Sequence, residues 1–535
     1  MPALSLATFN IGMACTDAHL HTPRANQAAM IVVDERGDVQ QATYAELAAS
    51  SSRFAQTLAA LDMAAGARIM IRLPNSLDYP TAFLGTLKAS AIAVPISPQL
   101  MGDELAYLAA DAGASALVTD AASWADLAAS WPMMPGLRHV LLTGAGAAAV
   151  AAANDNRRLQ VHALAELQAN QTDARPAPLT RPDDPAYLVY TSGTSGYPKG
   201  VLHAQRALLG HAPAWQAWFD FQGQERILHS GAFNWTYVLG TALMDPLYLG
   251  HTVIVSAGKA DAARWPRLIA TQRATIFIGV PTVYRQILAK TACTAADVPT
   301  LRHCMCAGEH LSDDVLHGWR RRFGLDIYEA IGMSECSYYL SQGRAHPLRP
   351  GAVGFPQPGH VVKLLDADLQ EVAVGEEGMI CIAEDDPGLF LRYWNQREET
   401  ARVRRGGWFL TGDYARQDAE GYFWFLGRKD DIIKSFGYRV SPFEVERVLK
   451  DHPAVADCAV VGEEVGPDKM VIAAHIILAP DQSVSVAELM AFVAAHLARY
   501  KCPRLIYFVR DLPRTPNGKV LRRALQPARG ESDAG

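Results

Sequence analysis

The chain has 535 residues, which is too long for one ordinary hydrophobic core, so we expect two or more domains. Half of the residues are apolar and 19% are charged, a composition typical of globular proteins. The net charge of −6, without any basic block, argues against nucleic acid or an anionic membrane surface as the main partner.

The N-terminal segment and the cysteines bear on the cellular compartment. Residues 3–15 are fairly apolar and end at a cysteine, but no Lys or Arg precedes Arg24, and Asn10 interrupts the run. A signal peptide has a basic start and an unbroken apolar stretch, so none is expected. No apolar run is long enough for a membrane span, and eight cysteines are ordinary usage for a reducing compartment. We therefore expect a cytoplasmic protein.

The first part of the chain alternates between helical and strand patterns. Apolar residues recur at helical spacing over residues 42–62, and a second helix is predicted at 78–90. Short apolar runs predict strands at 67–73, 91–96, 116–119 and 139–142. This alternation favours a largely parallel α/β architecture. The alanine- and glycine-rich segment 144–153 is interpreted as a surface insertion.

A stretch rich in glycine and hydroxyl groups follows, Tyr190-Thr-Ser-Gly-Thr-Ser-Gly-Tyr-Pro-Lys199-Gly200. Glycine lets the backbone take positive φ and approach a ligand closely, and successive N–H groups in such a turn form an anion-binding concavity. The hydroxyls add donors, and Lys199 adds a charge suited to phosphate. The spacing is not that of a Walker A motif. The stretch indicates a polyphosphate-binding loop, with a plain surface turn as the alternative.

Beyond this loop, two predicted strands end in polar or glycine-containing loops. A helix is expected at 205–219, and strands are expected at 226–230, 251–255, 273–279, 301–307 and 326–330. The fourth of these strands runs into Gly308-Glu309-His310, and the last runs into Ile331-Gly-Met-Ser-Glu335. In open α/β sheets, ligands bind outside the carboxyl ends of the strands, so these loops are candidates for a ligand site.

From about residue 350 the pattern changes to short alternating strands, which predict a β-rich unit such as a small barrel. The expected strands are 361–365, 378–383, 408–410 and 422–426. A charged break at 427–431 comes next. Capping-box patterns then begin at Ser441 and Ser485, and they predict two helices in a small C-terminal domain.

Six stretches together resemble the motifs of the adenylate-forming enzymes, which include acyl- and aryl-CoA synthetases, adenylation domains and luciferases. They are the loop at 190–200, Gly308-Glu309-His310, Glu329-Ala-Ile-Gly-Met-Ser-Glu335, Trp408-Phe-Leu-Thr-Gly-Asp413, Gly427-Arg-Lys-Asp430 and Pro513-Arg-Thr-Pro-Asn-Gly-Lys519. The resemblance implies an α/β fold with a large N-terminal domain, residues 1–429, of βα subdomains plus a small β-barrel. It implies a small mobile α+β C-terminal domain at residues 430–535.

The resemblance also implies a two-step reaction. A carboxylate attacks the α-phosphate of ATP to give an acyl-adenylate and pyrophosphate, and a thiol, usually that of coenzyme A, then displaces AMP. ATP, Mg²⁺ and coenzyme A are the implied cofactors or co-substrates. Glu335 would hold the Mg²⁺ together with substrate phosphates, a role that suits a carboxylate. Asp413 would accept hydrogen bonds from the ribose hydroxyls, and Arg428 would bind ribose or phosphate.

By the same resemblance, the ATP- or AMP-binding residues are expected to be Thr191, Ser192, Gly193, Thr194, Ser195, Gly196, Lys199, Gly308, Glu309, His310, Glu329, Ala330, Ile331, Ser334, Asp413, Arg428 and Lys519. Lys519, Lys199 and Glu335 are the expected catalytic residues. Lys519 would offset the negative charge that builds on the α-phosphate. Asp430 would be the hinge about which the C-terminal domain turns between the two steps.

The acid pocket is expected along Phe233, Asn234, Trp235 and Tyr237, with Gly332 at one wall. The segment carries no aspartate to pair with an ammonium group, which disfavours a free α-amino acid. Asn234 stands where many acyl-CoA synthetases have histidine. Gly332 stands where acetate-specific relatives have tryptophan, so we expect an acid larger than acetate, either medium-chain or aromatic, and a Gly332→Trp variant shifted toward shorter acids.

Three readings of the function follow. The first is an acid–CoA ligase, and the second is a stand-alone adenylation enzyme that loads a carrier protein. The third, an inactive ATP-binding scaffold, is opposed by the intact Lys199, Glu335, Asp413, Arg428 and Lys519. The expected partners are small molecules: the acid, ATP and coenzyme A. A homodimer stays open, as does a lysine acyltransferase acting on Lys519, since some relatives are switched off by acylation of the matching lysine.

Overall fold

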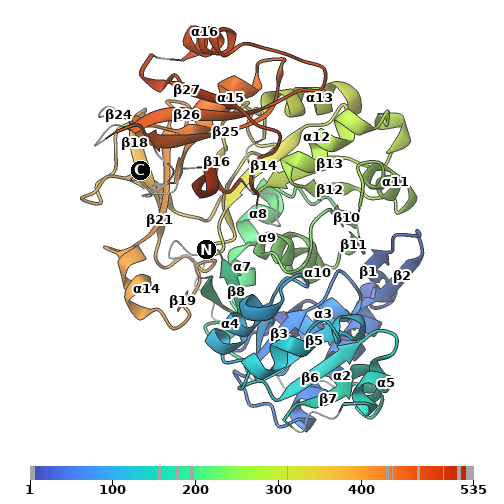
Figure 1. The fold of residues 1–535 in the computed structure, drawn as a ribbon. Coiled ribbons are helices and arrows are strands. Elements are labelled where there is room, and N and C mark those ends of the chain that lie inside the picture. The colour runs from blue at the N-terminus through green and yellow to red at the C-terminus, as the bar shows by residue number, and fades with distance from the viewer. Residues whose placement is uncertain are drawn as a thin grey trace, which may run out of the picture.

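The computed structural model describes residues 7–154, 158–174, 180–191, 198–258, 260–309, 311–428, 431, 433–435, 438–466, 470–497, 499–514 and 520–525. Within these ranges the chain forms two large sheets, a smaller antiparallel sheet and a C-terminal unit with two sheets of its own. Figure 1 shows the first large sheet at one end of the molecule and the C-terminal unit at the other. None of the described helices has the length and apolarity that a bilayer crossing requires.

The first large sheet contains the predicted parallel strands and ends in an antiparallel hairpin. Its order is β19-β9-β8-β4-β3-β5-β6-β7, and the strands from β8 to β7 run parallel. The strands are β3 (Arg68–Arg72), β4 (Ile92–Pro95), β5 (Ala116–Asp120), β6 (His139–Thr143), β7 (Gln160–Ala163), β8 (Pro185–Thr191), β9 (Lys199–Ala204) and β19 (Arg392–Tyr393). The helices associated with it are α2 (Tyr44–Ala60), α3 (Asp78–Lys88), α4 (Gly102–Ala112), α5 (Ala147–Ala152) and α6 (Leu164–Ala169).

The second large sheet carries the strand ends that the sequence marks as a ligand site. Its order is β16-β15-β14-β13-β12-β10-β11-β1-β2. The strands are β1 (Ala28–Val33), β2 (Val39–Thr43), β10 (Arg226–His229), β11 (Thr252–Ser256), β12 (Ile276–Gly279), β13 (His303–Ala307), β14 (Ile327–Gly332), β15 (Tyr338–Ser341) and β16 (Phe355–Pro356). Its helices are α1 (Ile11–Ala14), α7 (Ala207–Gly210), α8 (Ala212–Ala217), α9 (Thr236–Leu239), α10 (Asp245–Leu249), α11 (Arg264–Thr271), α12 (Pro281–Lys290) and α13 (Asp313–Phe323).

The main hydrophobic core lies between the two large sheets. Helices α2 and α3 supply its aromatic side chains, among them Tyr44, Phe54 and Phe83, all fully buried. Strand β3 contributes Ile69 from one sheet and β11 contributes Val255 from the other. Because α2 and α3 are apolar on more than one face, they join the two sheets into one body. The position of the second sheet is therefore fixed by the first.

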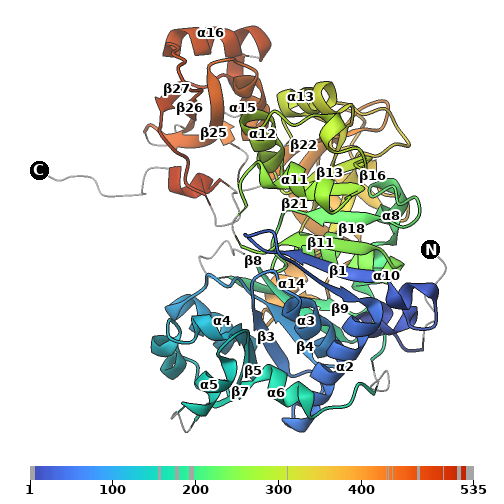
Figure 2. The same ribbon diagram turned by 90° about the vertical axis from the view of Figure 1, so that its right-hand side faces the viewer.

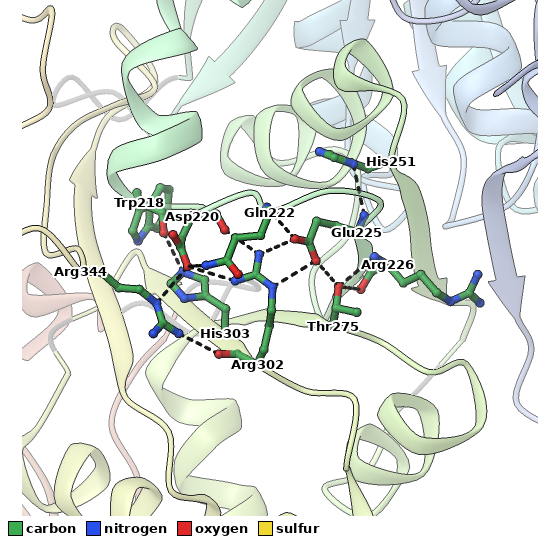
Figure 3. Close-up of polar contacts among 10 residues, drawn as sticks. All are labelled: Trp218, Asp220, Gln222, Glu225, Arg226, His251, Thr275, Arg302, His303 and Arg344. Atoms are coloured by element: carbon green, nitrogen blue, oxygen red, sulfur yellow. Dashed lines mark hydrogen bonds and ion pairs between the residues drawn. The ribbon is translucent and has the colours of Figure 1, made fainter. Parts of the chain in front are cut away.

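A charged network ties together the amino ends of β10, β12 and β13 (Figure 3). Arg302 pairs with Glu225 and, at 3.0 Å, with Asp220, which also lies 2.9 Å from Arg344. Burial alone would raise the pKa of Glu225, but hydrogen bonds from Arg302 and Thr275 hold this pKa below its ordinary value. The network fixes the strands at the end opposite to the polar loops, so the carboxyl ends stay free for a ligand.

The β-rich segment forms a five-stranded antiparallel sheet in which the long strand β21 (Trp408–Gln417) pairs with three neighbours. These are β18 (Glu377–Ala383), β20 (Arg404–Arg405) and β22 (Phe423–Arg428), while β17 (Val362–Leu365) pairs with β18. Helix α14 (Arg397–Val403) precedes β20. Among the described strands, the pairing does not close the sheet on itself. The predicted barrel is therefore an open sheet in these ranges.

The C-terminal unit stands at the end of the second large sheet, as Figure 2 shows. It contains the pair β23 (Ile433–Ser435) and β24 (Tyr438–Val440), and the sheet of β25 (Val455–Glu464), β26 (Met470–Leu478) and β27 (Leu505–Phe508). Its helices are α15 (Pro442–Lys450) and α16 (Val486–His496). The unit has its own apolar cluster, which includes Val445, Leu449 and Val493.

Two local predictions differ from the structure, and a third gains detail. Segment 144–153 is largely exposed, as expected of a surface insertion, and it contains α5 between β6 and β7. The helix predicted at 205–219 is broken into α7 and α8, with Pro213 in the first turn of α8. At α15, Ser441 caps the helix as predicted. Glu444 does not complete a capping box, because its carboxylate accepts a hydrogen bond from the Lys501 ammonium group at 2.6 Å.

Candidate functional site

A cavity of about 280 Å³ lies between the second large sheet, the β21–β22 hairpin and the C-terminal unit. Eight of the residues singled out from the sequence line it: Gly308, Glu309, Glu329, Ala330, Ile331, Gly332, Asp413 and Arg428. The C-terminal unit contributes charged residues, including Glu446, Arg447, Lys450, Asp457, Arg514 and Arg522. Motifs that are far apart in the sequence therefore meet at one cavity.

Two parallel neighbours, β13 and β14, bring the first two loops together. Ala307 and Ala330 are register partners, so Gly308 and Ile331 both follow at the same edge of the sheet. Gly308 has φ of +90°, a conformation that glycine adopts without strain. The prediction that these two strands end at one ligand site agrees with this arrangement.

Glu329 and Glu309 are acidic residues that line the cavity, and their carboxyl groups have different hydrogen-bond partners. Burial raises the pKa of Glu329 to about 8, although the Leu311 N–H, 3.2 Å from Oε1, favours the charged form. Glu309 accepts a hydrogen bond from the Thr282 hydroxyl at 2.7 Å. The two carboxyl groups are thus held in fixed positions beside the strand ends.

Asp413 and Arg428 face each other across the β21–β22 hairpin. The two residues are register partners, and Arg428 Nε lies 3.4 Å from Asp413 Oδ1. The Asp413 side chain is 7% exposed, whereas that of Arg428 is 49% exposed. The Thr411 hydroxyl accepts from the Asp413 backbone N–H at 3.0 Å, which fixes the turn before the carboxylate. A ligand hydroxyl could approach this pair from the cavity.

The predicted polyphosphate loop connects β8 to β9. These strands are antiparallel, and Thr191 lies opposite Lys199 at the open end of the hairpin. Residues Ser192, Gly193, Thr194, Ser195 and Gly196 lie outside the described residues. The ammonium group of Lys199 sits 3.6 Å from the centre of the Tyr393 ring and 3.7 Å from Glu399. Lys199 is therefore held at the base of the loop by a cation–π contact and an ion pair.

Tyr393 is a site residue that the sequence reasoning missed. Its hydroxyl donates to Glu335 Oε1 at 2.8 Å, while its ring face contacts Lys199. One side chain thus positions the expected metal-binding carboxylate and the expected phosphate-binding lysine. The sequence signal is the aromatic pair Tyr393-Trp394 at the end of a short apolar run, and that pair alone does not reveal which strand it joins.

Glu335 is the carboxylate to which the resemblance assigns Mg²⁺. Its residue is 7% exposed, and Tyr393 orients one of its oxygens. Among the residues with described positions, no group of three His, Cys, Asp or Glu side chains is arranged to hold a metal ion. This donor set suits a Mg²⁺ that is bound by one carboxylate and by substrate phosphates, and not a cage made of protein alone.

The predicted acid-pocket residues lie on and before α9, and they do not all have the same environment. Phe233 is 1% exposed and stacks on Tyr79 at 5.0 Å, so its ring belongs to the core. Asn234 and Trp235 are half-buried. Tyr237 lies against the second large sheet, in an apolar cluster that includes Ala307 and Ala330. None of the four lines the cavity, although Tyr237 packs beside the strand ends that do.

The structure explains why position 332 is glycine, which the sequence did not reveal. A Cβ atom at this position would lie 1.5 Å from the carbonyl oxygen of Ser337, across the β14–β15 turn. The glycine is therefore required by a close backbone approach. The expectation that a tryptophan here would simply fill an acid pocket does not fit this backbone, although Gly332 does line the cavity.

Three further predicted residues, His310, Asp430 and Lys519, lie outside the described residues. Ser334 is described, and its carbonyl oxygen lies 2.7 Å from His203 Nε2, so its loop is anchored to β9. Arg514 and Val520, which flank the segment that carries Lys519, both line the cavity. The described residues on either side of this segment therefore lie at the site.

Several known proteins resemble this chain in sequence and fold over most of their length. The family profile described as AMP-binding enzyme matches residues 20–394, and the profile of the AMP-binding enzyme C-terminal domain matches 444–519. Benzoate–CoA ligase of Thauera aromatica is 32% identical over 93% of this chain and 92% of that protein. A human mitochondrial acyl-coenzyme A synthetase is 29% identical over 96% of this chain and 87% of that protein.

Among solved structures, an anthranilate–CoA ligase in complex with anthranoyl-AMP superimposes with a TM-score of 0.87 and 28% identity, over 98% of both chains. The two family profiles together cover most of the large part and of the C-terminal unit, and residues 395–443 lie between them. With residues from five of the six motifs lining one cavity, these matches identify the chain as a member of the AMP-binding, adenylate-forming enzyme family.

Proposed function

We propose that the protein is an ATP-dependent acid–CoA ligase that acts on an aromatic carboxylic acid. The acid is activated as an acyl-adenylate with release of pyrophosphate, and the thiol of coenzyme A then takes the acyl group with release of AMP. The observation that carries this proposal is the meeting of Gly308, Glu329, Asp413 and Arg428 at one cavity.

The proposed nucleotide site uses the two strand ends and the hairpin. Gly308 and Ile331 would contact the adenine from neighbouring strands, and Asp413 would accept hydrogen bonds from the ribose hydroxyls, as one carboxylate can do. Arg428 lies close enough to Asp413 to hold this carboxylate and to reach a phosphate.

The phosphates would be bound by the β8–β9 loop, Lys199 and Glu335. Bound Mg²⁺ would neutralise phosphate charge and help to orient the α-phosphate for in-line attack. Tyr393 supports this role because its hydroxyl orients Glu335 and its ring holds Lys199. Lys519 is proposed to supply the remaining positive charge in the first step, and Asp430 to act as the hinge between the steps.

An aromatic acid is favoured over a medium-chain acid by the surroundings of α9. Tyr237 is flanked by Trp218 at 6.2 Å and by His229 at 5.1 Å, so the wall of this region is made of rings. Flat rings pack well against such a wall. Benzoate– and anthranilate–CoA ligases among the similar proteins point the same way.

The test is acid-dependent AMP formation by the purified protein with ATP and Mg²⁺, measured for a panel of aromatic and medium-chain acids with and without coenzyme A. We expect an aromatic acid to give the highest kcat/KM and AMP release to depend on coenzyme A. Equal turnover with a carrier protein in place of coenzyme A would favour the adenylation-enzyme alternative. No AMP with any acid would refute the proposed function.

A further inference from the structure

Two buried polar atoms, one on α9 and one beside it, have no hydrogen-bond partner within the described part of the chain. They are the hydroxyl oxygen of Tyr237 and Nε2 of His229. His229 is 1% exposed, and its ring meets the Tyr237 ring edge-on, at 5.1 Å and 69°. A buried polar group without a hydrogen bond is costly, so two of them side by side need an explanation.

The tautomer of His229 can be read from its other nitrogen. The backbone N–H of Gly231 donates to Nδ1 at 2.8 Å, so Nδ1 carries no proton. Burial lowers the pKa of His229 to about 3, so the ring is neutral at physiological pH. The proton of the neutral ring therefore sits on Nε2, and the unpartnered atom is a hydrogen-bond donor. The Tyr237 hydroxyl can both donate and accept.

The pair lies on the same face of the sheet as the cavity wall. His229, Ile278 and Met305 are successive register partners across β10, β12 and β13, so their side chains share one face. Ala307 lies two residues beyond Met305 and therefore on this same face, directly before the cavity residue Gly308. Neither residue of the pair lines the cavity itself, but Tyr237 packs against the cluster that contains Ala307 and the cavity residue Ala330.

We propose that Tyr237 and His229 form a polar end of the acid pocket, which selects an aromatic acid that carries a ring hydroxyl group. This inference rests on the proposed function and names the substrate class for the same site. The ring hydroxyl would accept from His229 Nε2–H and donate to the Tyr237 oxygen. One hydroxyl group then satisfies both buried atoms, because it has one proton and two lone pairs.

The energetic consequence is a preference against the unsubstituted acid. Benzoate would leave both protein groups buried without partners, whereas a hydroxybenzoate of matching geometry would pair them. We expect kcat/KM for the best hydroxybenzoate to exceed that for benzoate by about 10-fold or more. An ordered water that bridges the two groups is the competing explanation, and it predicts no such preference.

The experiment compares kcat/KM for benzoate and for 2-, 3- and 4-hydroxybenzoate in the wild type and in variants. Tyr237→Phe and His229→Leu should each lower the hydroxybenzoate-to-benzoate ratio about 10-fold. His229→Gln, which keeps a donor near the Nε2 position, should restore part of the ratio. Tyr187→Phe, which removes an equally buried and unpartnered hydroxyl on β8, should leave the ratio unchanged.

The outcomes separate this inference from the proposed function. Equal kcat/KM for benzoate and every hydroxybenzoate, or a ratio that Tyr237→Phe and His229→Leu do not change, would overturn the hydroxyl-binding role and leave the ligase intact. Absence of AMP formation with all four acids would instead overturn the proposed function itself.

Discussion

At the scale of single residues, the site depends on side chains that hold other side chains. Tyr393 contacts both Glu335 and Lys199, two residues from separate motifs. Burial raises the pKa of Glu329, while a backbone N–H orients its carboxyl group. Each arrangement yields a prediction that can be tested with one substitution.

Tyr393→Phe removes the hydroxyl that orients Glu335 but keeps the ring below Lys199. We expect kcat/KM for ATP to fall about 10-fold, because a hydrogen bond to a charged group typically contributes about 1.5 kcal/mol. Steady-state kinetics at several Mg²⁺ concentrations measure this. Tyr507→Phe, which removes a hydroxyl 2.9 Å from Glu463 in the C-terminal unit, is the matched control. Equal kinetics for both variants would contradict the role of Tyr393.

Glu329→Gln tests the raised pKa of the buried carboxyl. The folded-state pKa of about 8 lies above the ordinary value of 4.5, so the folded protein holds this proton more tightly than the unfolded chain. The resulting stability is fully present below about pH 4.5 and is lost as the pH rises through about 8.

The glutamine variant lacks this dependence. The free energy of unfolding of the wild type should therefore fall relative to the variant between about pH 4.5 and 8, by up to a few kcal/mol. Denaturant unfolding at a series of pH values measures the difference. Parallel stability curves for the two proteins would show that folding does not raise the pKa of Glu329.

At the scale of elements, the sequence predicted the strands better than the connections between them. The apolar runs behind β3, β4, β5 and β6 are nearly continuous, because parallel strands are buried on both faces. The break between α7 and α8 coincides with Pro213 in the first turn of α8, a signal that apolar periodicity alone does not register. The pairing of β19 with β9 joins residues far apart in the chain, which no local pattern predicts.

Gly332 provides the test at this scale. Since a Cβ atom would collide with the Ser337 carbonyl, Gly332→Ala should distort the β14–β15 turn and lower activity with every acid, instead of shifting the preference among acids. Thermal unfolding should show a loss of about 1–3 kcal/mol. Gly136→Ala, where nothing lies within 4 Å of the added carbon, is the control. If Gly332→Ala keeps wild-type activity and an unchanged Tm, the backbone adjusts to the added carbon at no cost.

At the scale of the whole molecule, the cavity exists because the C-terminal unit meets the large part. Between residues with described positions, two ion pairs cross this boundary: Arg447 lies 3.2 Å from Asp313, and Arg285 lies 3.8 Å from Asp457. The motifs themselves were predictable from the sequence, since each is a local pattern. Their meeting at one cavity was expected from the family resemblance, whereas the ion pairs that hold this arrangement were not.

Arg447→Gln should loosen the C-terminal unit in the ligand-free protein. A partly exposed ion pair contributes at most about 1 kcal/mol, so the population of other orientations should rise no more than about fivefold. Small-angle scattering should show a larger radius of gyration than in Arg320→Gln, which breaks the Arg320–Asp326 pair within the large part. Identical scattering curves for the two variants would argue against this contact as a latch.

Lys519→Ala should separate the two proposed half-reactions. Because the ammonium group is proposed to offset charge on the α-phosphate, acyl-adenylate formation should fall by about 100-fold or more. Thioester formation from supplied acyl-adenylate should remain largely intact. Rapid-quench assays of each step measure the two rates, and an equal loss in both steps would remove Lys519 from the first step.

The most direct test of the proposed reaction follows one oxygen atom. With benzoate or a hydroxybenzoate labelled with oxygen-18 in its carboxylate, attack on the α-phosphate must transfer one labelled oxygen to AMP, while the acyl group appears as the coenzyme A thioester. We predict labelled AMP and acyl-CoA in equal amounts by mass spectrometry. Unlabelled AMP, or ADP and phosphate in its place, would contradict an acyl-adenylate intermediate and with it the proposed function.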